Sequence, residues 1–540
     1  MNSKITPSEI YAKYQKDVQY KTRLDLYRKV KKQENFFLGK QWEGVNAPDL
    51  PKPVLNFIKR VVNYLISVLV VDDIGIAFRN YNPLVKEKAG IQDPIKHFVT
   101  EEELAAIKAA VAEAMEPVIE KVLPAEIERI NENVKFKAKL RKIVRNMAVD
   151  NDVAAYIRFD TEKGSGADDQ VAGEIEFEIV DNTNIHFGDV MTDEVEKQPY
   201  IIISKLKLTE ELRRQYPELK DKIRSDGDEN DVVEEESEDE VTTVLIYLYK
   251  QNGTVWFCEC TQDVFLSAPV DTEQKLYPVV YTSWEPVKNQ YHGVGVVEET
   301  IPNQIEVNKL WAMALLFQKN NAFTITLYDK TKIDKWVNRP GAVIGTIGNP
   351  NDAFASSFKP HDMSNQVLQI VERTINLTKE FMGANDAVLG NINPQNTSAL
   401  VAVQKASAAP LELQKLSLYQ FIEDYVRICV DIMRAKYGLR YVQTEEGEQL
   451  VDFGSLDYDK DYSVDIGASA YFSETAQIET MNNLFAAGVI KDAKLLVENM
   501  PDKILPNKNK ILQSIEEYEA KQQALMQQQM ALGGMTDEVM

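Results

Sequence analysis

Cysteine and histidine are the side chains of this sequence that most readily bind metals or react. Cys258 and Cys260 stand two residues apart in a strand-like run, where alternation points both thiols to one face, and Cys429 is distant from them. Three cysteines are an odd number, so we expect no disulfide framework and infer a reducing compartment. The four histidines are also far apart in the sequence, so we predict neither a metal site nor a cofactor; they are His97, His186, His292 and His361.

The sequence motifs of common enzymes are missing. There is no GxxxxGK[ST] phosphate loop, which disfavours a nucleotide-driven motor, and HExxH and GxSxG are absent too. Gly293-Val294-Gly295 lacks the third glycine of a dinucleotide site. Ten of the fifteen residues of 226–240 are acidic, but such a run is typical of a solvated loop and cannot hold metal ligands at fixed distances. We therefore predict that the protein is not an enzyme.

The charge of the chain limits how it can meet nucleic acid. Its 540 residues carry 61 Lys and Arg against 84 Asp and Glu, a net charge of −23, which excludes a grip on phosphates over a large area. With 44% hydrophobic residues the chain can bury a core, and its length suggests two to four domains. The most apolar stretch, 54–71, is interrupted by Lys59 and Arg60, so we expect a buried helix and no membrane span.

The hydrophobic pattern predicts a mixed α+β chain. Helices are expected over 7–38 (with Ser8 as N-cap), 54–71, 101–122, 125–150 and 209–223. Strands are expected over 74–80, 173–180 and 200–206, with a hairpin that joins 241–249 to 254–265 across Gln251-Asn252-Gly253.

The middle of the chain combines long helices with a small insert. A helix over 296–320 precedes a compact β-rich insert over 323–360, which includes the run AVIGTIG at 342–348, and a helix resumes over 364–382. A polar loop then leads into the longest helix, 398–437, which Pro410 should kink and Gly438 should end. Strands return over 440–472, and the remainder is helical to about residue 532.

Four stretches, in this order, resemble the portal proteins of tailed phages. The first runs from Phe37-Leu38-Gly39-Lys40-Gln41-Trp42 to Leu55-Asn56-Phe57-Ile58, and the second from Ile179 through Gly188-Asp189 to the strand that follows. The third contains Gly293-Val294-Gly295, Gln304 and Asn308 and is similar to the start of the first stem helix. The fourth, Gly383 to Leu400 followed by Gln404, is similar to the tunnel loop of the family.

This resemblance implies a portal-type fold with long stem and tunnel helices, a β-rich wing, a small α/β clip and a helical C-terminal crown. The implied divisions are the wing at 1–287, stem helix 1 at 288–321, the clip at 322–365, stem helix 2 at 366–384, the tunnel loop at 385–400, the tunnel helix at 401–437, the wing return strands at 438–472 and the crown at 473–540.

The resemblance also implies a function and a set of partners. The chain would form a homo-oligomeric ring, usually of twelve copies, that is the double-stranded DNA channel at one vertex of the capsid. It would assemble in the host cytoplasm, nucleate the head, and contact the major capsid protein, the terminase large subunit and a head-tail adaptor protein. An acidic wall would repel the DNA backbone and let the duplex slide.

Candidate contact residues follow from the same resemblance. The residues expected to face DNA are Asn385, Asn391, Asn393, Gln395, Asn396 and Lys405, although an ordinary solvated loop would have the same composition. The aromatic residues of the clip could anchor partners or form a private core; they are Tyr328, Trp336, Phe354 and Phe358. The alternatives are another head or neck structural protein and a packaging enzyme subunit, which the missing phosphate loop disfavours.

Overall fold

The computed structural model describes most of the chain up to residue 468. The described residues are 5–70, 74–80, 122–163, 173–226, 240–321, 325–333, 335–337, 339, 341–352, 355–358, 365–383, 411–444, 447–455, 462–468, 497, 511, 512 and 514. The chain divides into two compact units, residues 1–70 with 77–465 and residues 71–76 with 466–540. The following description concerns the first unit, apart from the two-stranded sheet of β1 (Ile74–Asn80) and β14 (Tyr462–Ala468).

The N-terminal segment forms two helices, α1 (Pro7–Arg23) and α2 (Leu26–Leu38), where one was predicted. Asp25 between them has a left-handed backbone with φ 56°, which no α-helix can contain. The prediction of Ser8 as N-cap was wrong, because Thr6 caps α1 and exchanges hydrogen bonds with Glu9. α2 ends at Gly39, as predicted, with φ 91°.

The next helices form a layer around α2. α3 (Phe57–Val70) buries one face and exposes Lys59 and Arg60, which confirms the predicted buried helix. The helix predicted over 125–150 is broken by Lys135 at φ 54° into α5 (Leu123–Asn133) and α6 (Phe136–Asp150). α2, α3 and α6 pack against one another. The helix predicted over 101–122 lies almost entirely outside the described residues.

Two antiparallel sheets form the body of the unit. The first has the order β3-β2-β9, from β3 (Glu174–Val180), β2 (Asp152–Asp160) and β9 (Val279–Ser283). The second has the order β4-β5-β6-β7-β8, from β4 (Ile185–Phe187), β5 (Tyr200–Leu208), β6 (Val241–Gln251), β7 (Thr254–Cys260) and β8 (Phe265–Asp271). The predicted hairpin is confirmed in β6 and β7, whose turn residues Asn252 and Gly253 both have positive φ.

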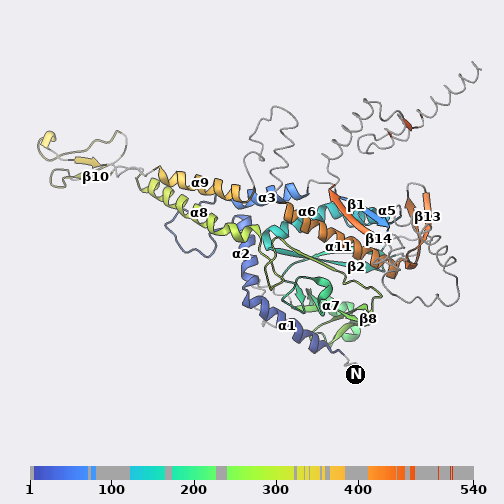
Figure 1. Cartoon of the computed structure of the whole chain (residues 1–540). Coiled ribbons are helices and arrows are strands. Elements are labelled where there is room, and N and C mark those ends of the chain that lie inside the picture. Colours follow the sequence, from blue (N-terminus) through green and yellow to red (C-terminus); the bar gives the residue numbers. More distant parts are fainter. Residues whose placement is uncertain are drawn as a thin grey trace, which may run out of the picture. The chain divides into compact units, whose positions relative to one another are not determined.

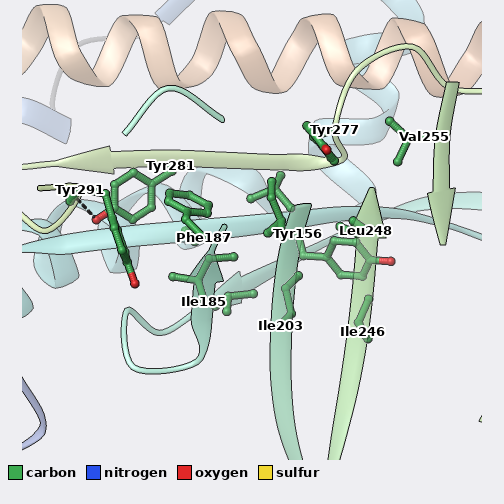
Figure 2. Packing of buried hydrophobic residues seen from close by; sticks show 14 residues of the cluster. Tyr156, Ile185, Phe187, Ile203, Ile246, Leu248, Val255, Tyr277, Tyr281 and Tyr291 are labelled. Carbon is green, nitrogen blue, oxygen red and sulfur yellow. Dashed lines mark hydrogen bonds between the residues drawn. The ribbon is translucent and has the colours of Figure 1, made fainter. Parts of the chain in front are cut away.

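A cluster of buried aliphatic and aromatic side chains fills the space between the two sheets (Figure 2). Tyr156 of β2 and Tyr281 of β9 meet Phe187, Ile203 and Leu248 of the other sheet there. The helix α11 (Glu412–Lys436) packs against β2 and β9, and most of its residues between Leu418 and Met433 are buried. This packing explains why β2 is buried on both faces over Asp152–Ile157.

The helix predicted over 209–223 is shorter in the structure. α7 covers Thr209–Gln215, and Pro217 begins a 3-10 turn, Pro217–Leu219, because proline cannot continue the hydrogen-bond pattern of the helix. Most of the acidic run, residues 227–239, lies outside the described residues. A 3-10 turn also forms at Val195–Lys197.

The middle of the chain forms an antiparallel helix pair that carries a small strand module. α8 (Val296–Asn321) and α9 (Gln366–Phe381) pack together (Figure 1), and the chain between them forms β10 (Ile325–Tyr328) and β11 (Ala355–Phe358), which pair with each other. Residues 342–348, predicted as part of a β-rich insert, form no strand, and a 3-10 turn follows at Pro350–Asp352.

The last described elements complete the body. Residues 398–410 of the predicted long helix, with Pro410, lie outside the described residues, and the described part is α11, followed by Gly438 at φ 57°. β12 (Leu439–Thr444) and β13 (Gly447–Asp452) form a hairpin, and a 3-10 turn follows at Phe453–Ser455. Helices together with antiparallel sheets confirm the α+β class.

Candidate assembly site on the paired helices

The glycines before α8 fix where this helix begins. Glu285 and Val294 form an isolated antiparallel bridge, and a Cβ atom on Gly293 would lie 2.6 Å from the carbonyl oxygen of Glu285. A Cβ atom on Gly295 would lie 2.8 Å from Oδ1 of Asn151, which instead accepts a hydrogen bond of 2.9 Å from the Gly295 amide. The Gly-x-Gly motif is therefore a close approach of two backbones and no nucleotide site.

A buried hydrogen-bond network, which we call the anchor network, holds the first half of α8. Asn308 donates to Gln41 Oε1 over 2.6 Å, and Gln304 donates to the carbonyl of Leu55 over 2.8 Å and to Asn308 over 3.0 Å. Gln41, Gln304 and Asn308 are all buried. The first and third stretches of the portal resemblance thus meet in space, and their amides hold α8 to the loop between α2 and α3.

A second network ties the start of α8 to α2 and α6. Asn151, which follows α6 at φ 80°, donates to Glu298 over 2.7 Å and accepts from Gln33 over 2.9 Å. Lys29 of α2 forms an ion pair of 3.0 Å with Glu298. Because these partners come from three separate elements, the base of α8 is positioned by tertiary contacts.

A third network, which we call the α1 network, buries charged groups between α1 and the second sheet. Lys21 is fully buried and donates to the carbonyls of Asn182, Thr183 and Ile185 over 2.9, 3.0 and 2.5 Å. Burial lowers the pKa of Lys21 to about 8, although the charges of Asp17 and Asp152 oppose this shift.

Histidine and aspartate complete the α1 network. His186 Nδ1 lies 2.6 Å from Asp17 Oδ2, and His186 Nε2 lies 3.1 Å from Ser204 Oγ. Burial lowers the pKa of His186 to about 4. Burial alone would raise the pKa of Asp17, but the hydrogen bond with His186 and the charge of Lys21 outweigh it and lower that pKa. Asp17 therefore stays ionised and accepts a hydrogen bond from the Nδ1–H group of a neutral His186.

The contacts from Asp17 to His186 to Ser204 have the order of a hydrolase triad. Ser204 and His186 are both buried, however, and neither lines either of two clefts in the described part of the chain, of about 520 and 560 Å³. A nucleophile needs an approaching substrate. The three side chains therefore join α1 to β4 and β5.

The helix pair buries little of its own apolar surface. Asn303 of α8 donates to Thr378 of α9 over 3.1 Å, and Val371 and Thr378 are the buried residues of α9. No residue of α8 after Ala314 is buried. Apolar side chains are exposed on both helices, among them Met313 at 61% and Phe381 at 81%. The others are Leu315, Ile370 and Leu377. Ile370, Leu377 and Phe381 fall on one face of α9 by their spacing, and exposed apolar side chains on one face are typical of an interaction site.

The strand module has a small core. Tyr328 and Trp336 stack with ring centroids 5.9 Å apart and an angle of 24° between the planes, and both are half-buried. Ile333 is buried beneath the module, whereas Leu327, Val343 and Ile347 are exposed, Val343 at 96%. The two described aromatic residues thus contact each other within one chain and keep part of their surface open.

The other candidate contact residues are not brought together by the described residues. Asn385, Asn391, Asn393, Gln395, Asn396, Lys405 and Phe354 lie outside them, and of Phe358 only the backbone pairing with Ile325 is described. Lys415 lies over the ring of Tyr419 at 5.7 Å. The sequence also did not reveal the α1 network, because Asp17 and His186 are 169 residues apart and nothing local marks them as partners.

A body that fixes the base of a helix pair, with exposed apolar residues along that pair, is typical of a subunit of a larger assembly. Residues 205–539 match the family model of phage P22-like portal proteins, and because the match covers more than half of the 540 residues, the chain belongs to this family. It is thus a structural protein of the phage portal, which confirms the resemblance. No curated protein was found to match the chain. None of the described helices is long and apolar enough to cross a membrane.

Proposed function

We propose that copies of this chain close into a ring around a channel that conducts double-stranded DNA during packaging and ejection. Membership of the portal family supports a homo-oligomeric ring at a vertex of the capsid. The observation that carries the proposal for this chain is the exposed apolar surface of α8 and α9. Because water would otherwise cover these side chains, burying them between copies stabilises the assembly.

Cyclic symmetry makes each contact head-to-tail, so two different faces of the helix pair must meet. Both helices expose apolar residues: Met313 on α8, and Ile370, Leu377 and Phe381 together on one face of α9. We propose a contact between the α8 face of one copy and the α9 face of the next, in a ring of twelve.

We propose that the segments that precede the buried part of α11 form the channel wall. Between Leu418 and Met433 that helix packs its apolar face against the body of its own chain, and those buried side chains cannot touch a duplex. We therefore assign the wall to the tunnel loop, 385–400, and to the tunnel helix before Leu418. Amides such as Asn391 and Gln395 would make weak contacts to phosphates, and the charge of −23 per chain keeps such contacts few.

The strand module is the proposed contact for the terminase large subunit during packaging and for the head-tail adaptor protein afterwards. Its support is the exposure of Leu327, Val343 and Ile347 next to the Tyr328–Trp336 stack, since aromatic and aliphatic anchors dominate protein interfaces. The major capsid protein is the expected neighbour of the ring at the vertex, where the ring would nucleate head assembly.

Introducing negative charge on the exposed apolar face of α9 tests whether this face holds the copies together. The double variant Ile370→Asp/Phe381→Asp should remain monomeric, because each carboxylate would have to be buried at the contact. The matched control is Met191→Asp/Val270→Asp, which places the same charges on apolar residues that are exposed elsewhere.

Analytical ultracentrifugation measures the oligomeric state of each protein, and negative-stain imaging shows whether rings form. The wild-type chain and the control should form rings with a central opening, and the α9 variant should sediment as a folded monomer with an unchanged circular dichroism spectrum. A solid particle, or rings formed equally well by the α9 variant, would overturn the proposal.

A further inference from the structure

The helices α2, α3 and α6 are strongly basic although the whole chain is acidic. Together they contain eleven lysines and arginines but only two acidic residues, Glu34 and Asp150. The three helices pack against one another and against α8 (Figure 1), so their cations belong to one group of packed helices, which we call the basic layer. The eleven residues are Arg28, Lys29, Lys31, Lys32, Lys59, Arg60, Lys137, Lys139, Arg141, Lys142 and Arg145.

Part of this charge faces solvent without an acidic partner. Lys29 pairs with Glu298 and Arg145 pairs with Glu34, so these two cations are used within the fold. Within the part of the chain that the structure describes, five other exposed residues form no ion pair: Lys32, Lys59, Arg60, Arg141 and Lys142. They come from all three helices.

The aromatic rings of two buried phenylalanines contact cations from all three helices. Lys59 of α3 and Arg145 of α6 lie 5.8 and 5.0 Å from the ring centroid of Phe37, and Lys32 of α2 lies 5.9 Å from that of Phe36. Both phenylalanines are 7% exposed. Attraction between a cation and an aromatic face restricts the side chain, so the charges are concentrated around the junction of the helices.

We propose that the basic layer binds the phosphate backbone of double-stranded DNA. Helices of 13 to 15 residues are about 20 Å long, which spans several phosphates of a duplex. Contacts of lysine and arginine to phosphates supply affinity without reading sequence. The layer therefore binds DNA weakly, independently of sequence and with a strong dependence on salt.

The composition of the exposed face favours DNA over an acidic protein surface. A protein interface is built around an apolar or aromatic centre. Within α2, α3 and α6, Leu38 at the end of α2 is the one large apolar residue that is exposed. The basic layer belongs to a single chain, so this inference stands whether or not the copies close into the proposed ring.

Fluorescence anisotropy of a labelled duplex of about 20 base pairs, roughly two turns, tests the proposal across a salt series. The test variant of the full chain is Lys59→Gln/Arg60→Gln/Arg141→Gln/Lys142→Gln. The matched control, Arg214→Gln/Lys220→Gln/Lys222→Gln/Arg224→Gln, removes the same charge from exposed residues around α7.

We expect the test variant to bind at least about tenfold more weakly at low salt, and its salt slope to shrink by about 0.9 for each lost phosphate contact. The control should stay within about twofold of the wild type. Equal losses in both variants, or no binding by the wild type, would overturn the proposal. Unchanged DNA binding together with lost association between copies would also reject it, and would assign the layer to an acidic neighbouring chain.

Discussion

At the scale of single residues, the α1 network links stability to pH through His186. The pKa of His186 is about 4 in the folded chain and 6.5 when unperturbed, so the unfolded state binds more protons between these values. The stability contributed by neutral His186 is therefore complete above pH 6.5 and is lost as the pH falls to 4. This contribution to the free energy of unfolding is up to roughly 3 kcal/mol.

The variant His186→Gln should remove this contribution, because an amide does not titrate. We expect the free energy of unfolding of the wild type, measured with urea, to fall more steeply between pH 6.5 and 4 than that of the variant. Comparing the two proteins cancels the carboxyl groups that titrate nearby, such as Asp150, whose pKa burial raises to about 7. Parallel pH profiles would show that His186 is not coupled to folding.

Lys21 gives a second prediction at this scale. Lys21→Met leaves three carbonyls without their donor and leaves Asp17 without its ion-pair partner at 3.7 Å. Removing one member of a buried charged pair costs about 3–5 kcal/mol. Thermal and urea unfolding at pH 7 measure the loss. The control Lys16→Met, at an exposed position of the same helix, should change stability by less than about 0.5 kcal/mol. Similar losses in both variants would contradict a special role of Lys21.

At the scale of elements, the start of α8 depends on a close approach of two segments. Gly295→Ala places a Cβ atom 2.8 Å from Asn151 Oδ1 and 3.0 Å from the carbonyl of Ala148. Since the neighbours are themselves packed, we expect a loss of about 1–3 kcal/mol in urea unfolding. Gly345→Ala is the matched control, because nothing lies within 4 Å of its Cβ position, and it should be neutral. Equal stability of the two variants would refute this account of the glycine motif.

The elements also show where local patterns are sufficient and where they fail. The hairpin of β6 and β7 was predicted correctly because Asn252-Gly253 is a local turn signal. The breaks at Asp25 and Lys135 were missed, because a single aspartate or lysine within a helical pattern is a much weaker turn signal than Asn-Gly. The run at 342–348 alternates like a strand but finds no partner to pair with among the described residues.

At the scale of the whole molecule, net charge opposes association between copies. Each chain carries −23, so copies repel one another at low ionic strength and salt screens this repulsion. We expect ring formation, followed by light scattering, to strengthen from about 0.05 to about 0.5 M salt. DNA binding by the basic layer should weaken over the same range. Rings that dissociate as salt rises would show that ion pairs, and not apolar contacts, hold the copies together.

The amino-acid sequence by itself determined the acidic charge, the missing enzyme motifs, the α+β class and the order of segments that resembles a portal protein. These are properties of composition and of local periodicity, which need no partner from elsewhere in the chain. The tertiary structure alone decided that Gln41 meets Asn308, that Asp17 meets His186, and that the basic helices α2, α3 and α6 pack together. Burial and charge clustering depend on which distant segments pack together, and this packing minimises the free energy of the whole chain rather than of any one segment.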